Sequence, residues 1–178
     1  MGQVIAVTSG KGGTGKTTIS AGIAECLAAE GFRVLCIDAD VGLRNLDISL
    51  GMADTAPVSF ADVLNDRYSL SEATAHPEIP GLWLLTAPIA ERPEVIRFRD
   101  FGSLLETARE HFDYCVIDSP AGIGDGFAFA TRYADRVLVI AASHNQPLIC
   151  RTDRGAALGC LHVARRLRGQ RVPLLRIR

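Results

Sequence analysis

The sequence contains almost no lysine. Of its 19 basic residues only Lys11 and Lys16 are lysines, and both lie in one glycine-rich segment, whereas all the others are arginines. A compact, flexible ammonium group and a planar guanidinium group are not interchangeable. The distribution therefore marks this segment as a candidate site.

Other absences exclude whole classes of function. The formal net charge is only −1, so no overall field favours a nucleic acid or a membrane surface, and we expect no nucleic-acid partner. The five cysteines include no C-x-x-C pair, which argues against an iron–sulfur site and suggests a reducing, cytoplasmic setting. The four histidines have no metal-ligand spacing, and we expect neither a signal peptide nor a membrane span.

The 178 residues suit one domain spanning 1–178, and 48% apolar with 22% charged residues is an ordinary composition for a globular protein. Short apolar runs alternate with stretches of helical spacing. This alternation predicts an α/β fold, with a doubly wound, mostly parallel sheet and helices on both faces. The predicted strands are 4–8, 33–37, 82–85, 114–117, 136–140 and 172–175, and the predicted helices are 17–30, 100–111 and 149–167.

The glycine-rich segment joins the first predicted strand to the first predicted helix. Residues 10–17 match the phosphate-binding pattern G-x-x-x-x-G-K-[ST]. At such a junction, backbone N–H groups converge on phosphate oxygens and the helix N-terminus favours negative charge. Lys16 is expected to meet the β- and γ-phosphates, and Thr17 to offer its hydroxyl to Mg²⁺. The predicted nucleotide-binding residues here are Gly10, Lys11, Gly12, Gly13, Thr14, Gly15, Lys16, Thr17 and Thr18.

Carboxylates follow two further predicted strands. Asp38 and Asp40 come after the strand 33–37, and Asp118 comes directly after four apolar residues in the Walker B arrangement. In an open parallel sheet, ligands bind beyond the carboxyl ends of the strands, so Asp38 and Asp40 should share one rim with the phosphate loop. The strand before Asp118 should deliver one carboxylate towards Mg²⁺. One of the first two can hold Mg²⁺ through water while the other orients an attacking water.

A lysine directly after the first glycine is unusual for a phosphate loop. With it, Gly10–Thr18 resembles the deviant Walker A motif of the ParA/MinD family of ATPases. The stretch 38–47 resembles the family's switch I, with its GLRNLD closest to the MinD branch, and 118–123 resembles switch II. The resemblance implies an ATP-dependent sandwich dimer in which Lys11 reaches the phosphates bound by the partner subunit, much as an arginine finger does.

The resemblance also implies individual roles. It places Asp40 on the catalytic water, and Asp38 and Asp118 with Thr17 around Mg²⁺. Asn45 and Arg44 are expected near the partner subunit. Backbone groups near Gly122 are expected to sense the γ-phosphate. The cofactors that the resemblance implies are ATP and Mg²⁺, and the implied catalytic residues are Lys11, Lys16 and Asp40.

For the family, the implied function is placement of the division septum, with a septum inhibitor and an ATPase-activating protein as partners. Related members would instead place a flagellum, a chromosome or a plasmid, and a non-catalytic nucleotide-binding adaptor is the alternative from another class. The sequence departs from the family at 142–147 and 151–154. It also stops before the family's base-recognition segment and C-terminal amphipathic helix. We therefore expect a cytoplasmic chain, with peripheral inner-membrane association only in a longer form.

Overall fold

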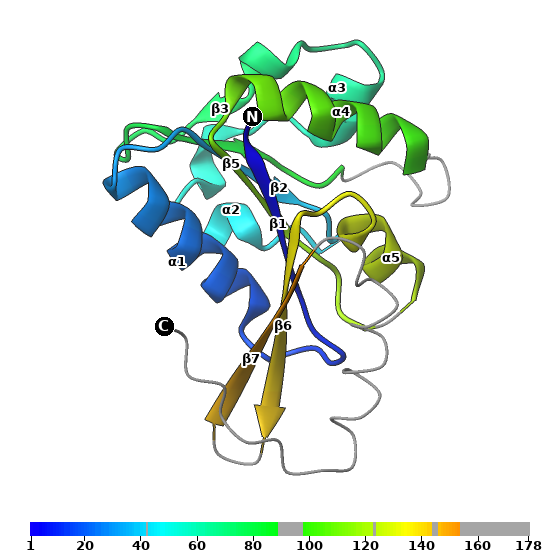
Figure 1. Cartoon of the computed structure of the whole chain (residues 1–178). Helices are drawn as coiled ribbons and strands as arrows, with labels where there is room; N and C mark the ends of the chain where they lie inside the picture. The colour runs from blue at the N-terminus through cyan, green and yellow to red at the C-terminus, as the bar shows by residue number, and fades with distance from the viewer. Residues whose placement is uncertain (42, 89–97, 123, 144–145, 154–178) are drawn as a thin grey trace.

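The computed structural model describes residues 1–41, 43–88, 98–122, 124–143 and 146–153 (Figure 1). Their centre is a seven-stranded sheet in the order β3-β4-β2-β5-β1-β6-β7. The strands are β1 Gln3–Thr8, β2 Val34–Asp38, β3 Thr74–Ala75, β4 Leu82–Leu85, β5 Tyr114–Asp118, β6 Arg136–Ser143 and β7 Gln146–Asp153. The five inner strands run parallel, and only the edge strands β3 and β7 pair antiparallel. The predicted doubly wound, mostly parallel sheet is confirmed.

The inner strands are short apolar runs with little exposed surface, as expected of parallel strands covered on both faces. β5 lies between β1 and β2, with Val7 and Asp38 each opposite Asp118 in the ladder. The ends of these three strands therefore come together at one rim. The helices are α1 Lys16–Ala29, α2 Leu46–Ser49, α3 Phe60–Leu64, α4 Phe98–His111 and α5 Asp125–Thr131, with short 3₁₀ turns η1 Ala53–Thr55 and η2 Leu70–Glu72.

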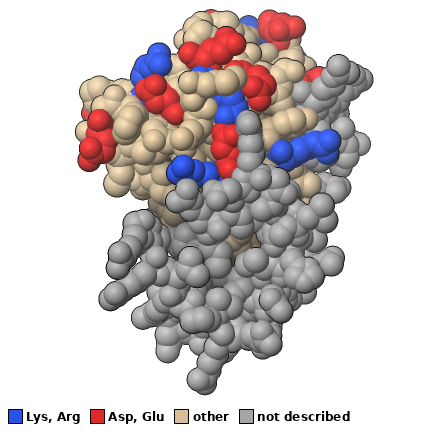
Figure 2. All heavy atoms as spheres, viewed as in Figure 1, with Lys and Arg blue, Asp and Glu red and all other residues tan. Residues whose placement is uncertain are grey.

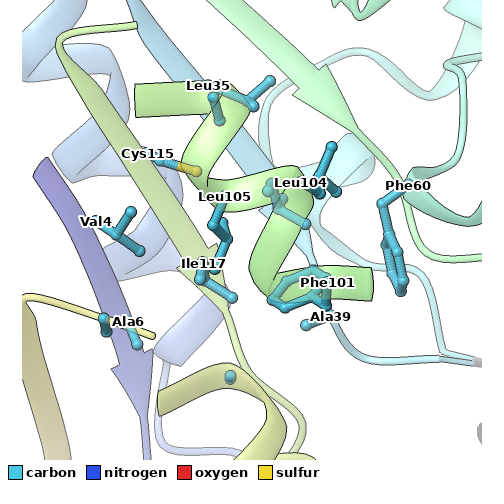
Figure 3. Close-up of a cluster of buried hydrophobic side chains, with 14 of the residues drawn as sticks. Val4, Ala6, Leu35, Ala39, Phe60, Phe101, Leu104, Leu105, Cys115 and Ile117 are labelled. Atoms are coloured by element: carbon cyan, nitrogen blue, oxygen red, sulfur yellow. The ribbon is translucent and has the colours of Figure 1, made fainter. Parts of the chain in front are cut away.

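Two apolar clusters cover the two faces of the sheet, because alternate residues of each strand point to opposite sides. On one face, Val4, Leu35 and Cys115 pack with Phe101 and Leu105 of α4 (Figure 3). α3 and α5 contribute side chains to the same cluster. On the other face, small residues of α1 pack closely on β1, β2 and β5. The helices therefore lie on both faces, as predicted.

One predicted helix is wrong over the part of it that the structure describes. The helix expected over 149–167 begins inside β7, in which Gln146–Asp153 pair antiparallel with β6 throughout. The apolar residues of this segment have helical spacing, but the open edge of β6 presents N–H and C=O groups that pair with a neighbouring strand. This pairing, and not the spacing, sets the conformation of the segment. The remainder of this helix, and the strand predicted over 172–175, lie outside the described residues.

At the end of the sheet opposite the strand-end rim, a buried arginine joins three elements. The Arg109 guanidinium of α4 donates to the carbonyls of Gly2 (2.9 Å) and Tyr133 (3.0 Å) and forms an ion pair with Asp135. Asp135 also accepts the N–H of Val4 at 2.9 Å. This network holds the starts of β1 and β6 to the end of α4.

The described surface on the face drawn in Figure 2 has acidic and basic side chains interspersed, which matches the near-zero net charge. None of the helices in the described parts of the chain has the length and hydropathy that a membrane crossing requires.

Candidate functional site

The phosphate loop leaves β1 and enters α1 through two glycines in the left-handed region. Gly13 has φ +69° and Gly15 has φ +82°, which other residues adopt only with strain. Gly15 is the N-cap residue of α1, and its carbonyl accepts the N–H of Ile19 at 3.0 Å. As a glycine it has no side chain to accept the N–H groups of the first turn. These donors, at the positive end of the helix dipole, suit an anion.

The loop is also tied internally. The buried Ser9 hydroxyl donates to the carbonyl of Lys11 at 2.6 Å. Lys11 itself is exposed, so its side chain points out of the subunit's packed interior while its backbone is held. Lys16, five residues on, is in contrast buried at the start of α1. The two lysines therefore have different surroundings, which fits two different roles.

Asp118, at the end of β5, accepts a hydrogen bond from a hydroxyl of α1. Ser20 Oγ lies 2.9 Å from Oδ1 of Asp118, and the Thr17 hydroxyl of the same helix also lowers the pKa of this carboxylate. Burial raises the pKa of Asp118 to about 6, against the lowering effect of these hydroxyls and of Lys16, while nearby Asp38 raises it further. The Walker B carboxylate thus lies beside the phosphate loop, as predicted.

Asp38, at the end of β2, is fully buried and anchors the loop that follows it. Its Oδ1 accepts the N–H of Asp40 at 2.9 Å, and its Oδ2 accepts those of Asn45 and Leu46 at 3.1 Å each. Burial raises the pKa of Asp38, and these three N–H groups act against that rise. Its assignment as a magnesium support stays a prediction, whereas its contacts give it a direct role in fixing the 39–46 loop.

Asp40 is half-buried within this loop. Burial raises its pKa, and the positive charge of Lys16 acts in the opposite direction. Lys16 therefore influences both Asp40 and Asp118, so the three predicted motifs form one electrostatic unit.

The two residues expected near a partner subunit differ in their contacts. Asn45 is exposed at the N-cap of α2. Arg44 has φ +40° and its Nε lies 2.8 Å from Oδ2 of Asp47, so its guanidinium is engaged within its own segment. Asn45 is therefore the more exposed of the two residues.

Backbone hydrogen bonds join the three loops. The N–H of Ala39 donates to the Asp118 carbonyl at 2.9 Å, and the N–H of Gly122 donates to the Ser9 carbonyl at 3.0 Å. Gly122 has φ +109°, which requires glycine. It lies beside the phosphate loop as expected, but in this structure its N–H is occupied by Ser9 and is no free donor for a phosphate.

The segment after Gly122 is held by a close contact. A Cβ at Gly126 would lie 2.3 Å from Cγ of Pro120, far inside van der Waals distance, whereas one at Gly124 would meet nothing within 4 Å. Gly126 therefore lets the start of α5 approach the loop that follows β5.

The residues present fit a magnesium ion. Among the described residues, no three or more His, Cys, Asp or Glu side chains are grouped to hold a metal. Mg²⁺ characteristically takes one or two protein ligands and completes its shell with phosphate oxygens and water. The Thr17 hydroxyl and the buried Asp118 carboxylate beside the phosphate loop are such a set. Ser20 is the residue that the sequence did not single out, although it lies one helical turn after Lys16.

Comparisons with known proteins agree with this geometry. Residues 2–148 match a family model described as an AAA domain. The chain is 45% identical over 155 residues to the septum site-determining protein MinD of Thermotoga maritima, covering 86% of this chain and 57% of that protein. This chain thus spans just over half the length of that relative.

Solved structures give the same result. The MinC:MinD cell division protein complex of Aquifex aeolicus matches with a TM-score of 0.68 and 40% identity, over 77% of this chain and 55% of that one. The septum site-determining protein MinD of Pyrococcus horikoshii, complexed with Mg-ADP, matches with a TM-score of 0.67 and 28% identity, over 78% and 57%. The chain therefore belongs to this AAA-domain family and is a MinD-type member of the ParA/MinD group of P-loop proteins.

Proposed function

We propose that the chain is an ATP-dependent dimerisation switch that hydrolyses ATP to ADP and phosphate and takes part in septum-site placement. The observation that carries the proposal is the meeting of three loops at one rim, where the N–H of Ala39 donates to the Asp118 carbonyl and the N–H of Gly122 donates to the Ser9 carbonyl. The names of the relatives, and the Mg-ADP in the complex of the P. horikoshii protein, support the same ligand and process.

The phosphate loop would bind the nucleotide through its backbone. The N–H groups of residues 10–18 and the start of α1 surround an anion, and the Lys16 ammonium would neutralise the β- and γ-phosphates. Thr17 and Asp118 would hold Mg²⁺, with Asp38 as further support. When bound, Mg²⁺ would supply positive charge that offsets the negative charge developing on the phosphates.

Asp40 would orient the attacking water. The backbone N–H of Asp40 donates to Oδ1 of Asp38, so the main chain that carries this carboxylate is fixed before substrate binds. Phosphoryl transfer depends mainly on positioning and charge stabilisation, so a carboxylate on a fixed backbone is suited to align the water. Asp40→Ala should retain ATP binding and lose hydrolysis, and an unchanged rate would refute this role.

Lys11 would act in the partner subunit. Its exposed side chain on a tied backbone is suited to cross an interface, and Asn45 is exposed on the same rim. Lys11→Ala should then bind ATP as a monomer and lose both dimerisation and hydrolysis. Lys11→Arg is the matched control, because it keeps the charge and changes only its shape. Intact dimerisation and turnover in Lys11→Ala would refute the role in trans.

The deciding measurement is the molar mass in solution, by light scattering, of the Asp40→Ala protein with Mg-ATP and with Mg-ADP. A doubled mass with Mg-ATP alone is expected. An unchanged mass in both nucleotides would contradict the switch, and ATP binding without turnover in the unmodified chain would favour a nucleotide-binding adaptor. A septum inhibitor is proposed as a partner, since the A. aeolicus relative was solved with MinC. An activating protein is proposed from the family resemblance.

A further inference from the structure

Ser20 is fully buried on α1, yet its hydroxyl contacts a charged group from a distant part of the chain. Oγ lies 3.0 Å from the carbonyl of Lys16 and 2.9 Å from Oδ1 of Asp118. A hydroxyl has one proton, and both neighbours are acceptors when the carboxylate is ionised. The bond to the carboxylate is then the charge-assisted and stronger one.

The carboxylate needs such a partner. The terminal torsion of an aspartate is broad, so the rotamer alone does not fix the plane of its two oxygens. Asp118 ends a strand, and the Ser20 hydroxyl reaches its Oδ1 from α1, on the helix face that also carries Thr17. A hydrogen bond from a rigid helix to one oxygen of the carboxylate defines its orientation.

We propose that Ser20 is a positioning residue for the magnesium site, holding the Asp118 carboxylate in the orientation in which it and Thr17 face the cation together. The inference rests on the proposed function and adds to it a residue outside the phosphate-binding motif. Partners of this kind, one shell removed from the metal, typically contribute tenfold to a hundredfold in metal affinity. Ser20 acts through Asp118 and touches neither nucleotide nor metal.

A purely structural role predicts something different. A serine that only bonds back to the carbonyl four residues earlier does not strengthen a helix, and alanine is the better helix former. Thr131 provides the matched control, since it is buried on α5 and its hydroxyl makes such a bond to the Phe127 carbonyl at 2.8 Å. Thr131→Val removes a buried hydroxyl without touching the site.

The test is the affinity for a fluorescent ATP analogue, measured by anisotropy over a series of Mg²⁺ concentrations and in EDTA. Ser20→Ala should raise the Mg²⁺ concentration for half-maximal effect about tenfold and leave binding in EDTA within about twofold. Ser20→Thr, which keeps the hydroxyl, should restore the Mg²⁺ dependence, and Thr131→Val should not change it. Should Ser20→Ala fail to fold, Ser20→Cys, with its weak donor, takes its place with the same expectation.

The double variant decides whether Ser20 acts through Asp118. In an Asp118→Asn background, Ser20→Ala should cause no further loss, because coupled residues are not additive. The inference is overturned if Ser20→Ala has the Mg²⁺ dependence of the unmodified protein, or if its loss is the same in both backgrounds. If the unmodified protein itself binds ATP without response to Mg²⁺, the proposed function fails as well, which distinguishes the two failures.

Discussion

Replacing Asp118 by asparagine should make the nucleotide-free protein more stable near neutral pH. The carboxylate is 2% exposed and burial raises its pKa to about 6 from an ordinary value of 3.8. At about 1.4 kcal/mol for each pH unit, the ionised form costs the folded state about 3 kcal/mol. An amide of the same shape carries no charge, and its oxygen still accepts the hydrogen bond from the Ser20 hydroxyl.

The sign of the pH dependence of stability follows from the rise in the pKa of Asp118 on folding. The folded state binds this proton more tightly than the unfolded state, so stability is highest below about pH 4 and falls as the pH rises from 3.8 towards 6. Above that window the loss is complete. Asp118→Asn does not titrate, so it should match the unmodified protein near pH 4 and exceed it by about 3 kcal/mol at pH 7.5.

Urea unfolding followed by circular dichroism in EDTA, at pH 4, 5.5 and 7.5, measures this difference. Asp62→Asn is a control with the opposite pH dependence. The Ser59 hydroxyl lowers the pKa of Asp62, so the ionised Asp62 carboxylate stabilises the folded state above pH 3.8, and this stabilisation is lost on acidification. A difference between Asp118→Asn and the unmodified protein that is constant with pH, or an Asp118→Asn protein less stable at pH 7.5, would refute the reasoning.

Three further outcomes are expected. Arg109→Met should lower the free energy of unfolding by about 3 kcal/mol in urea, because it removes the buried guanidinium that pairs with Asp135 and donates to the Gly2 and Tyr133 carbonyls. A loss below about 1 kcal/mol would contradict this. Gly126→Ala should lower the free energy of unfolding by about 1–3 kcal/mol through overpacking. Gly124→Ala, where the added methyl group meets open space, should change it by less than about 0.5 kcal/mol. Equal effects of the two substitutions would show that the close contact is unimportant. Burial raises the pKa of the Cys115 thiol to about 12, so this cysteine should stay unlabelled by a thiol reagent until urea unfolds the protein, as peptide mass analysis would show.

Much of the fold and most of the site could be predicted because the signals are local. Apolar runs mark the inner strands, and Asp38 and Asp118 directly follow such runs, so the rule that ligands bind at the carboxyl ends of parallel strands brings them together. The phosphate loop is a continuous pattern, and two of its glycines, Gly13 and Gly15, have positive φ angles.

The remaining features depend on partners distant in the sequence. Ser20 lies 98 positions from the carboxylate that it contacts, and Arg109 lies 107 from the carbonyl of Gly2. Neither shows any motif along the chain. The strand β7 was missed for a similar reason, because its conformation is set by the open edge of β6 and not by its own spacing.

The position of β5 between β1 and β2 also sets an order of assembly during synthesis. The phosphate loop leaves the ribosome early, but the strand that precedes it, Gln3–Thr8, can pair with Tyr114–Asp118 only when those residues have been made. The strand that ends at Asp38 also pairs with Tyr114–Asp118, so this pairing too must follow the synthesis of those residues. Such distant pairings form slowly, since the intervening chain must be closed into a loop first. Nascent chains that end before β5 should therefore have no nucleotide affinity, and binding should begin in one step once that strand has emerged.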